Sequence, residues 1–258
     1  MTTPDTLALE LTPPPGGQIL HQAELATVIW GDCRDPTVIA QAPDRYGLLC
    51  TDPPYGMNWK SSRGKNFAHL QGDDGTVDWP AVLGQWARRL GNNRHVYVFG
   101  YAPEQLIAPL VLGPTAEIIW DKMSHGLGNM SHHWGTRHER ITFGVSTANH
   151  THGGAKRGGA LAARMRRGTV VQVPRKNATA VTRHPTEKPV PLMAQLIESS
   201  TVRGDLVVDP CAGSGSTGVA AVLEGRRCFL VEYDRGYAEL AVERIKAAEK
   251  IAALIDAA

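Results

Sequence analysis

A short apolar run followed by a glycine-rich segment constrains the fold of this chain more than any other feature. Residues 205–210 read DLVVDP, residues 211–218 read CAGSGSTG, and the stretch 216–227 has helical spacing. An apolar run of this length indicates a buried strand, and the glycines allow the backbone to turn tightly and to pass close to a ligand. The segment therefore predicts a strand–loop–helix unit with a ligand near its loop.

The same alternation of short apolar runs and amphipathic stretches fills the chain from residue 26 onward. Further strands are predicted at 26–30, 46–51, 95–100, 116–122, 140–146 and 228–234. Further helices are predicted at 36–42, 79–90, 104–112, 189–200 and 236–258. This pattern is typical of an α/β fold, a sheet with helices on both faces. Residues 1–17 are rich in Pro and Gly and predict a flexible N-terminal arm, and residues 18–258 predict one domain.

Composition narrows the class of protein. The chain has 258 residues and four scattered cysteines without a CxxC pair, so a disulfide framework or a zinc ribbon is not expected. The sequence shows neither an apolar run of about 18 residues nor a signal-peptide pattern. We therefore expect a cytoplasmic protein without a membrane-spanning segment.

The formal net charge of +2 hides an uneven distribution of charge. Residues 147–183, the basic segment, contain no Asp or Glu, so the rest of the chain is net acidic. The basic residues of the segment are Lys156, Arg157, Arg164, Arg166, Arg167, Arg175, Lys176 and Arg183. A segment of this kind favours contacts with phosphates, although a basic surface loop would look similar.

The glycine-rich loop alone leaves several interpretations open. It could be an ordinary tight turn, or the GxGxxG of a dinucleotide fold, since Gly213, Gly215 and Gly218 have that spacing. The carboxylate of Asp209 at the strand end instead suits a cationic group, such as the sulfonium or ammonium of S-adenosylmethionine. A P-loop is excluded because Val219 stands where its lysine should be. Glu232, at the end of the next strand, could accept hydrogen bonds from both ribose hydroxyls of either cofactor.

Asp52-Pro53-Pro54-Tyr55 directly follows the predicted strand 46–51. Two prolines make the turn rigid and donate no backbone N–H. The Asp52 carboxylate, the Pro53 carbonyl and the Tyr55 ring then offer two acceptors and a stacking face, which a flat base with an amino group requires. The alternative is a strand-ending turn in which Asp52 caps a helix.

Three motifs together resemble those of the amino-methylating DNA methyltransferases of the permuted (β) type. TDPPYG resembles their catalytic motif, VVDPCAGSGSTG their cofactor loop, and RHPTEKPVPL at 183–192 the segment that precedes the cofactor strand. The motifs occur in the order typical of the β type. The resemblance implies a seven-stranded, mostly parallel, Rossmann-like sheet that is circularly permuted, with the strand before Asp32 beside the strand that ends at Glu232.

The resemblance also implies roles for individual residues. Asp52, Pro53, Pro54 and Tyr55 would be catalytic. Asp32 would accept from the cofactor adenine amino group, a role compatible with its also being a helix N-cap. Thr186 and Lys188 would lie near the methionine end of the cofactor. Thr186 could instead cap the helix that begins at Pro189. The residues expected to bind S-adenosylmethionine are Asp32, Cys33, Thr186, Lys188, Asp209, Pro210, Ala212, Gly213, Gly215, Ser216, Thr217 and Glu232.

The implied reaction is methylation of the exocyclic N6 of an adenine flipped out of double-stranded DNA. Cytosine N4 is the close alternative, although enzymes of that type more often carry Ser where this chain has Asp52. An NAD-dependent oxidoreductase built on GxGxxG is the alternative from another class, but it would not need DPPY or the basic segment. A third alternative is a DNA-binding protein without catalytic activity, but the three intact motifs argue against it.

The expected contacts with DNA come from two places. Lys60, Arg63 and Lys65 lie in a polar stretch, residues 57–75, that could close over the flipped nucleotide or be a solvated insertion. The basic segment occupies the place of the family's target-recognition segment, with Lys156, Arg157, Arg164, Arg166, Arg167, Arg175 and Lys176 as the expected DNA contacts. His125, His132, His133 and His138 are expected to line the DNA cleft and not to bind zinc. The resemblance leaves a homodimer and a cognate restriction enzyme open as further partners.

Overall fold

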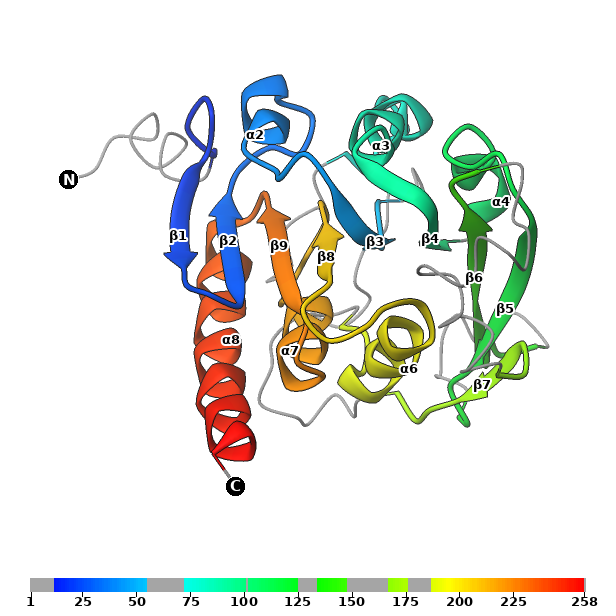
Figure 1. Cartoon of the computed structure of the whole chain (residues 1–258). Coiled ribbons are helices and arrows are strands. Elements are labelled where there is room, and N and C mark those ends of the chain that lie inside the picture. Colours follow the sequence, from blue (N-terminus) through cyan, green and yellow to red (C-terminus); the bar gives the residue numbers. More distant parts are fainter. Residues whose placement is uncertain are drawn as a thin grey trace.

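The computed structural model describes residues 12–54, 72–100, 102–124, 134–147, 167–175 and 187–257. These residues form one nine-stranded sheet in the order β1-β2-β9-β8-β3-β4-β6-β5-β7 (Figure 1). The strands are β1 Gln18–Gln22, β2 Ala26–Trp30, β3 Tyr46–Thr51, β4 Leu90–Gly100, β5 Thr115–Asp121, β6 His138–Val145, β7 Val170–Gln172, β8 Leu206–Asp209 and β9 Arg227–Glu232. The helices are α2 Pro36–Ala40, α3 Trp79–Ala87, α4 Pro103–Ile107, α6 Val190–Ser200, α7 Ser216–Leu223 and α8 Arg235–Asp256.

The centre of the sheet is parallel. Strands β2, β9, β8, β3 and β4 run in one direction, whereas β1 pairs antiparallel with β2 at one edge and β6 runs antiparallel to both β4 and β5. Trp30 at the end of β2 pairs with Glu232 at the end of β9, although about 200 residues separate them in the chain. This neighbour relation is the one implied by a permuted fold.

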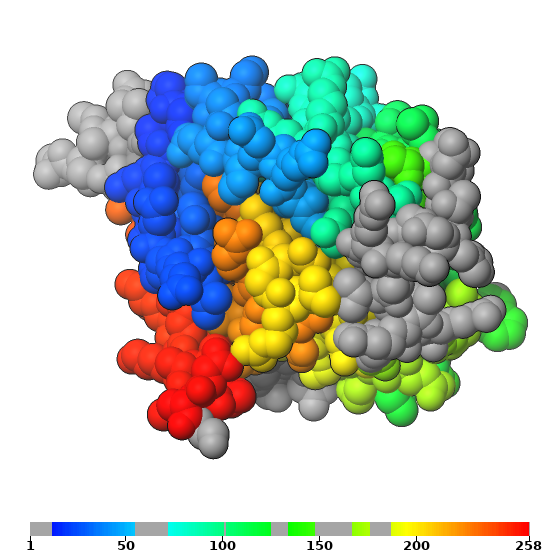
Figure 2. Space-filling view, viewed as in Figure 1, coloured from blue at the N-terminus to red at the C-terminus, as the bar shows by residue number. Residues whose placement is uncertain are grey.

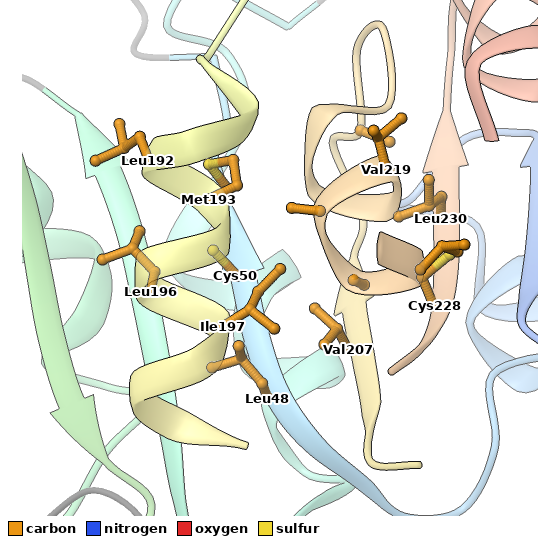
Figure 3. Packing of buried hydrophobic residues seen from close by; sticks show 14 of the residues in the cluster. Leu48, Cys50, Leu192, Met193, Leu196, Ile197, Val207, Val219, Cys228 and Leu230 are labelled. Atoms are coloured by element: carbon orange, nitrogen blue, oxygen red, sulfur yellow. The ribbon is translucent and has the colours of Figure 1, made fainter. Parts of the chain in front are cut away.

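Helices cover both faces of the sheet, as the alternating pattern predicts. Residues of α6, α7 and α8 pack on one face, against Leu48 and Val207 among others, while residues of α3 pack on the opposite face against Leu49 and Val208. Figure 3 shows Leu196 and Ile197 of α6 and Val219 of α7 among the side chains of the first core. In the space-filling view α6, coloured yellow, lies at the centre of one face (Figure 2). The four-residue β8 is buried throughout because helices cover it on both sides.

Among the described residues the sheet has two strands more than the seven expected from the resemblance. The edge strand β1 has the sequence QILHQ and exposes Ile19 to 44%, so it lacks the continuous apolar run that marks the central strands. The three-residue β7 lies inside the basic segment and pairs in parallel with β5. The expected α/β class and the mostly parallel arrangement are confirmed, and both added strands lie at the edges.

The structure describes residues 12–17 of the predicted flexible arm, and these residues lie against the domain. Residues 1–11 lie outside the described part of the chain, but Pro13 is buried and the Gly16 N–H donates to the Asp35 carboxylate at 2.8 Å. The Gly17 backbone packs so closely that a Cβ there would meet the Ile29 side chain at 2.8 Å. The small size of glycine permits this close packing.

The other helices and strands differ from their predicted bounds mainly at their ends. The helix expected at 104–112 ends at Ile107, and β4 begins at Leu90, earlier than the expected 95. Among the described residues no helix is long and apolar enough to cross a membrane. All four cysteines are free thiols.

Candidate active site

The carboxyl ends of the central parallel strands place four acidic residues along one edge of the sheet. Asp209 and Glu232 are the last residues of β8 and β9, while Asp32 and Asp52 follow β2 and β3 closely. The four strands are neighbours in the order β2-β9-β8-β3 (Figure 1). Ligands of open α/β sheets bind at this edge, so it is the candidate active site.

The glycine-rich loop forms a cradle above β8 because two of its residues have left-handed backbone. Gly213 has φ +52° and Gly215 has φ +80°, a region that other residues rarely adopt. A Cβ at Gly215 would also lie 2.7 Å from the Cβ of Ala241 on α8. Glycine therefore serves both the turn and the close packing of the loop on α8.

Asp209 is a buried carboxylate held by the loop that follows it. Its Oδ2 accepts a hydrogen bond from the Thr217 hydroxyl at 2.6 Å, and its Oδ1 accepts one from the Cys211 N–H at 3.1 Å. Burial raises the pKa of Asp209 to about 6, against the opposing effect of these hydrogen bonds. Asp209 thus organises the loop from below.

Glu232 connects the glycine-rich loop with the end of β9. Its Oε2 accepts from the Gly213 N–H at 2.7 Å and its Oε1 accepts from the Asp234 N–H at 2.8 Å. Burial raises the pKa of Glu232 to about 7, although these two N–H groups favour the ionised form. A carboxylate fixed in this way has oxygens oriented by the backbone, as binding of two neighbouring hydroxyls would require.

Asp32 forms a bidentate ion pair with Arg34, with the guanidinium Nε 2.8 Å from Oδ1 and Nη2 2.7 Å from Oδ2. The same guanidinium lies over the Tyr233 ring at 6.0 Å from its centroid. Asp32 does not cap the following helix: the N-cap of α2 is Asp35, whose carboxylate accepts from the Thr37 N–H at 2.8 Å. The expectation of a helix N-cap at Asp32 is therefore wrong, because three more residues precede the helix.

Cys33 and Cys211 both belong to the packing around the loop. Cys33 is buried and its carbonyl accepts from the Trp86 indole N–H at 3.0 Å. A hydrogen bond with the Cys33 thiol and burial raise the pKa of Cys211 well above its usual value. The Cys211 thiol is therefore not activated as a nucleophile, because a reactive thiolate requires a lowered pKa.

Asp52 meets a residue of the HPTEKP segment. The Lys188 ammonium forms an ion pair with Asp52 Oδ2, and it lies 2.9 Å from Oε1 of Glu139. Pro53 is buried and Pro54 partly buried beside it, whereas Tyr55 lies outside the described residues. The resemblance implied that Lys188 approaches the methionine end of the cofactor, and the structure places its ammonium on the catalytic motif.

The HPTEKP segment and the cofactor loop are joined by α8. Arg244 of this helix lies 2.9 Å from Oε1 of the buried Glu187, and its Nη1 donates to the Ser214 carbonyl at 2.6 Å. Thr186 lies outside the described residues, and the N-cap of α6 is Pro189, which has no capping side chain. Sequence reasoning missed Arg244 and Glu139, since each stands in an ordinary helix or strand without a motif.

Most of the expected DNA contacts lie outside the described residues, namely Lys60, Arg63, Lys65, Lys156, Arg157, Arg164, Arg166 and Lys176. Arg175 is exposed, and Arg167 forms an ion pair with Glu198 of α6 at 2.7 Å. His138 is exposed at the start of β6, whereas His125, His132 and His133 are also outside the described residues. In the part of the chain that the structure describes, no cluster of His, Cys, Asp and Glu could hold a metal ion.

These residues fit S-adenosylmethionine on structural grounds. The loop is free of side chains at Gly213 and Gly215, and the oriented carboxylate of Glu232 lies beside it. A buried carboxylate, Asp209, supplies negative charge under the loop, which suits a cationic cofactor better than a pyrophosphate. Asp52 follows the adjacent strand β3, so the catalytic motif and the cradle share one edge of the sheet.

Comparison with known proteins gives a consistent family. The model of a family described as DNA methylase matches residues 47–243. A curated relative, the DNA adenine methyltransferase YhdJ of Escherichia coli (strain K12), is 28% identical over 262 aligned positions, which cover 89% of this chain and 86% of the relative.

Two solved structures share the fold. PvuII DNA methyltransferase (cytosine-N4-specific) has a TM-score of 0.63 at 17% identity and covers 93% of this chain and 95% of that one. The complex of M1.HpyAVI with SAM has a TM-score of 0.56 at 19% identity and covers 78% of this chain and 89% of that one. At these identities the likeness concerns the fold alone, and it agrees with the mostly parallel, Rossmann-like sheet expected from the motifs.

Proposed function

Because this chain belongs to the DNA methylase family, whose model matches residues 47–243, we propose that it transfers a methyl group from S-adenosylmethionine to N6 of adenine in double-stranded DNA. The family match confirms the resemblance found in the sequence motifs. An NAD-dependent oxidoreductase is no longer a competing assignment, since the family match includes both the glycine-rich loop and the DPPY motif.

The observation that carries the proposal is the place of Asp52. Its strand β3 lies directly beside β8, which ends at Asp209 and leads into the glycine cradle. A base held at Asp52 would therefore face a cofactor held by the cradle and Glu232. Proximity of this kind can supply much of the rate enhancement of a two-substrate transfer.

The residues of the chain act on the amino group of the base. When bound, S-adenosylmethionine supplies a methyl group on a cationic sulfur. Asp52 and the Pro53 carbonyl accept hydrogen bonds from the two amino protons, which directs the nitrogen lone pair toward the methyl carbon. The nitrogen would take up the methyl group while the sulfur leaves with the electron pair of the C–S bond, and the surplus proton would pass to the Asp52 carboxylate and on to solvent. Tyr55 stacks on the flipped base, worth about 1–3 kcal/mol.

Adenine is favoured over cytosine by two independent observations. The motif begins with Asp52, where cytosine-N4 enzymes more often have Ser, and YhdJ, which matches over 89% of this chain, is described as an adenine methyltransferase. The cytosine-N4-specific PvuII enzyme matches at 17% identity, which indicates the fold and not the base.

We further propose that the basic segment contacts the DNA backbone and that a homodimer or a cognate restriction enzyme is a candidate partner.

A methylation assay tests the proposal directly. Unmodified double-stranded DNA incubated with S-adenosylmethionine and the protein should yield N6-methyladenine on digestion and mass spectrometry. S-adenosylhomocysteine at about 100 times its Kd should stabilise the fold by about 2.7 kcal/mol and raise Tm, whereas NAD should leave Tm unchanged. N4-methylcytosine as the product would replace the adenine assignment, and stabilisation by NAD alone would contradict the proposed cofactor.

Cofactor affinity should depend on pH through Glu232. In the free protein the pKa of this residue is about 7, so Glu232 is largely protonated below pH 7. Hydroxyl donors bind the ionised form better, so the Kd for S-adenosylhomocysteine should rise about tenfold between pH 8 and pH 6. Isothermal titration calorimetry at pH 6, 7 and 8 measures this dependence.

Two variants separate Glu232 from other groups. Glu232→Gln should bind more weakly at pH 8 and lose most of the pH dependence. Glu239→Gln removes an exposed carboxylate that pairs with Arg235 on α8 and should retain the dependence of the unmodified protein. A Kd independent of pH in the unmodified protein would show that Glu232 does not bind the cofactor through its ionised form.

A further inference from the structure

Four charged side chains, alternately acidic and basic, form a row of ion pairs that ends at the catalytic motif. Asp52 pairs with Lys188, Lys188 lies 2.9 Å from Glu139, and Glu139 lies 3.1 Å from Lys122. Glu139 is the second residue of β6, and Lys122 directly follows β5. Because β6 is antiparallel to its neighbours, its first residues lie at the same edge as the carboxyl ends of the parallel strands.

The side chains of this row of ion pairs are held in place because they are largely buried. The side chains of Lys188, Glu139 and Asp52 are 8%, 18% and 23% exposed. The Lys188 ammonium also lies 5.2 Å from the centroid of the buried Phe99 ring. A buried ammonium has little hydration and is stabilised by its carboxylates instead. Moving the Lys188 ammonium away from them would therefore cost free energy.

The electrostatic effects along this row of ion pairs agree with the geometry. Burial opposes the charge on Glu139, but Lys188 and Lys122 lower the pKa of this carboxyl to about 2. Burial likewise opposes the charge on Lys188, but Asp52 and Glu139 raise the pKa of the ammonium above its usual value. Both groups therefore stay charged throughout the working pH range.

We propose that Lys188 and Glu139 are positioning residues that hold Asp52 in its ionised form and in the orientation in which it accepts the amino protons of the target base. This inference rests on the proposed function, since it assigns that acceptor role to Asp52. Lys188 acts on Asp52 directly, whereas Glu139 acts by keeping the ammonium in place. Neither residue is required to touch the cofactor.

The pH titration of Asp52 tests the proposal without any cofactor. Selective ¹³C labelling of aspartate, with Asp52→Asn for assignment, allows the Cγ shift of Asp52 to be followed from pH 3 to pH 8. In Lys188→Met the midpoint should rise by about 1–2 pH units, because an opposite charge is removed. Besides Lys188, the Asp209 carboxyl and the Cys50 thiol interact electrostatically with Asp52, and both are present in every variant.

Activity provides the second measurement. At saturating S-adenosylmethionine, Lys188→Met should lower the single-turnover rate at pH 7.5 by about tenfold or more, and the acid limb of its pH profile should move upward with the Asp52 titration. The Kd for S-adenosylhomocysteine should stay within about threefold of the unmodified protein. Arg140→Met is the matched control: this neighbour of Glu139 pairs with Glu104 and Glu117, so its loss should leave the acid limb in place.

A double variant covers the case in which Lys188→Met does not fold, since that change leaves two buried carboxylates near each other. Lys188→Met/Glu139→Gln removes one of these charges and should fold while retaining the raised Asp52 midpoint. An unmoved midpoint in the folded variant overturns the proposal. A tenfold rise in Kd with an unmoved acid limb would assign Lys188 to the cofactor instead. Absence of methylation by the unmodified protein would contradict the proposed function and leave the Asp52 titration as the separate test of the positioning role.

Discussion

Asp52→Ala is expected to lower the rate of methyl transfer by roughly 10³-fold, within the range that a positioned proton acceptor contributes. Without this carboxylate, the amino group of the base loses an acceptor, and its lone pair remains delocalised into the ring. Cofactor binding should change little, since the glycine cradle, Asp209 and Glu232 remain in place. The measurement is single-turnover incorporation of a labelled methyl group, with a parallel calorimetric titration of S-adenosylhomocysteine.

Asp44→Ala is a matched control for this experiment. Asp44 is exposed in the turn that precedes β3, whereas Asp52 follows the same strand at its other end. The control should transfer methyl groups at the unmodified rate. Incorporation by Asp52→Ala at more than about a tenth of the unmodified rate would remove Asp52 from the acceptor role, since an essential acceptor contributes at least about 10²-fold.

Gly215→Ala is expected to destabilise the fold by about 3 kcal/mol and to lower Tm by about 6–12 °C. Two effects add at this position. A left-handed backbone at φ +80° costs an alanine about 1 kcal/mol or more, and the new Cβ would lie 2.7 Å from the Cβ of Ala241. Because the loop must move away from α8 to relieve this contact, the affinity for S-adenosylhomocysteine should fall as well.

Gly204→Ala separates the two effects. Gly204 has nearly the same backbone angle, φ +82°, but a Cβ there would have nothing within 4 Å. This variant should therefore lose only the backbone contribution, about 1 kcal/mol, and should bind the cofactor normally. The double variant Gly215→Ala/Ala241→Gly lacks the facing Cβ. Its loss in free energy of unfolding should therefore be about 1 kcal/mol smaller than the sum of the losses of the two single variants. Equal losses for Gly215→Ala and Gly204→Ala, measured by thermal and chemical unfolding, would exclude the contact with α8 as a cause.

The central part of the fold was predictable because its strands carry continuous apolar runs. The bounds of β2 and β3 match those predicted from ATVIW and YGLLCT, since both strands are buried. The strands β1 and β7 were missed because each lies at an edge, where exposure weakens the pattern. The packing of residues 12–17 against the domain was not visible in the sequence, because Pro and Gly are common both in flexible segments and in tightly packed turns.

The candidate site shows a similar division. Asp209, Glu232 and the loop glycines could be found because strand ends and glycine spacing are visible in the sequence. The environment of each carboxylate was not visible: Asp32 pairs with Arg34, and Asp35 caps α2 in its place. The site roles assigned from the resemblance remain predictions for the experiments described above.

The sequence by itself determined the family, the order of the motifs and the acidic residues at the strand ends, because each depends on short runs of neighbouring residues. Only the tertiary structure decided the partners of these residues. Lys188 meets Asp52 across 136 positions of the chain, and Glu139 joins them from an antiparallel strand. Such contacts arise because sheet pairing brings distant strand ends to one edge, and buried charges there must find opposite charges. No local pattern encodes that choice of partner.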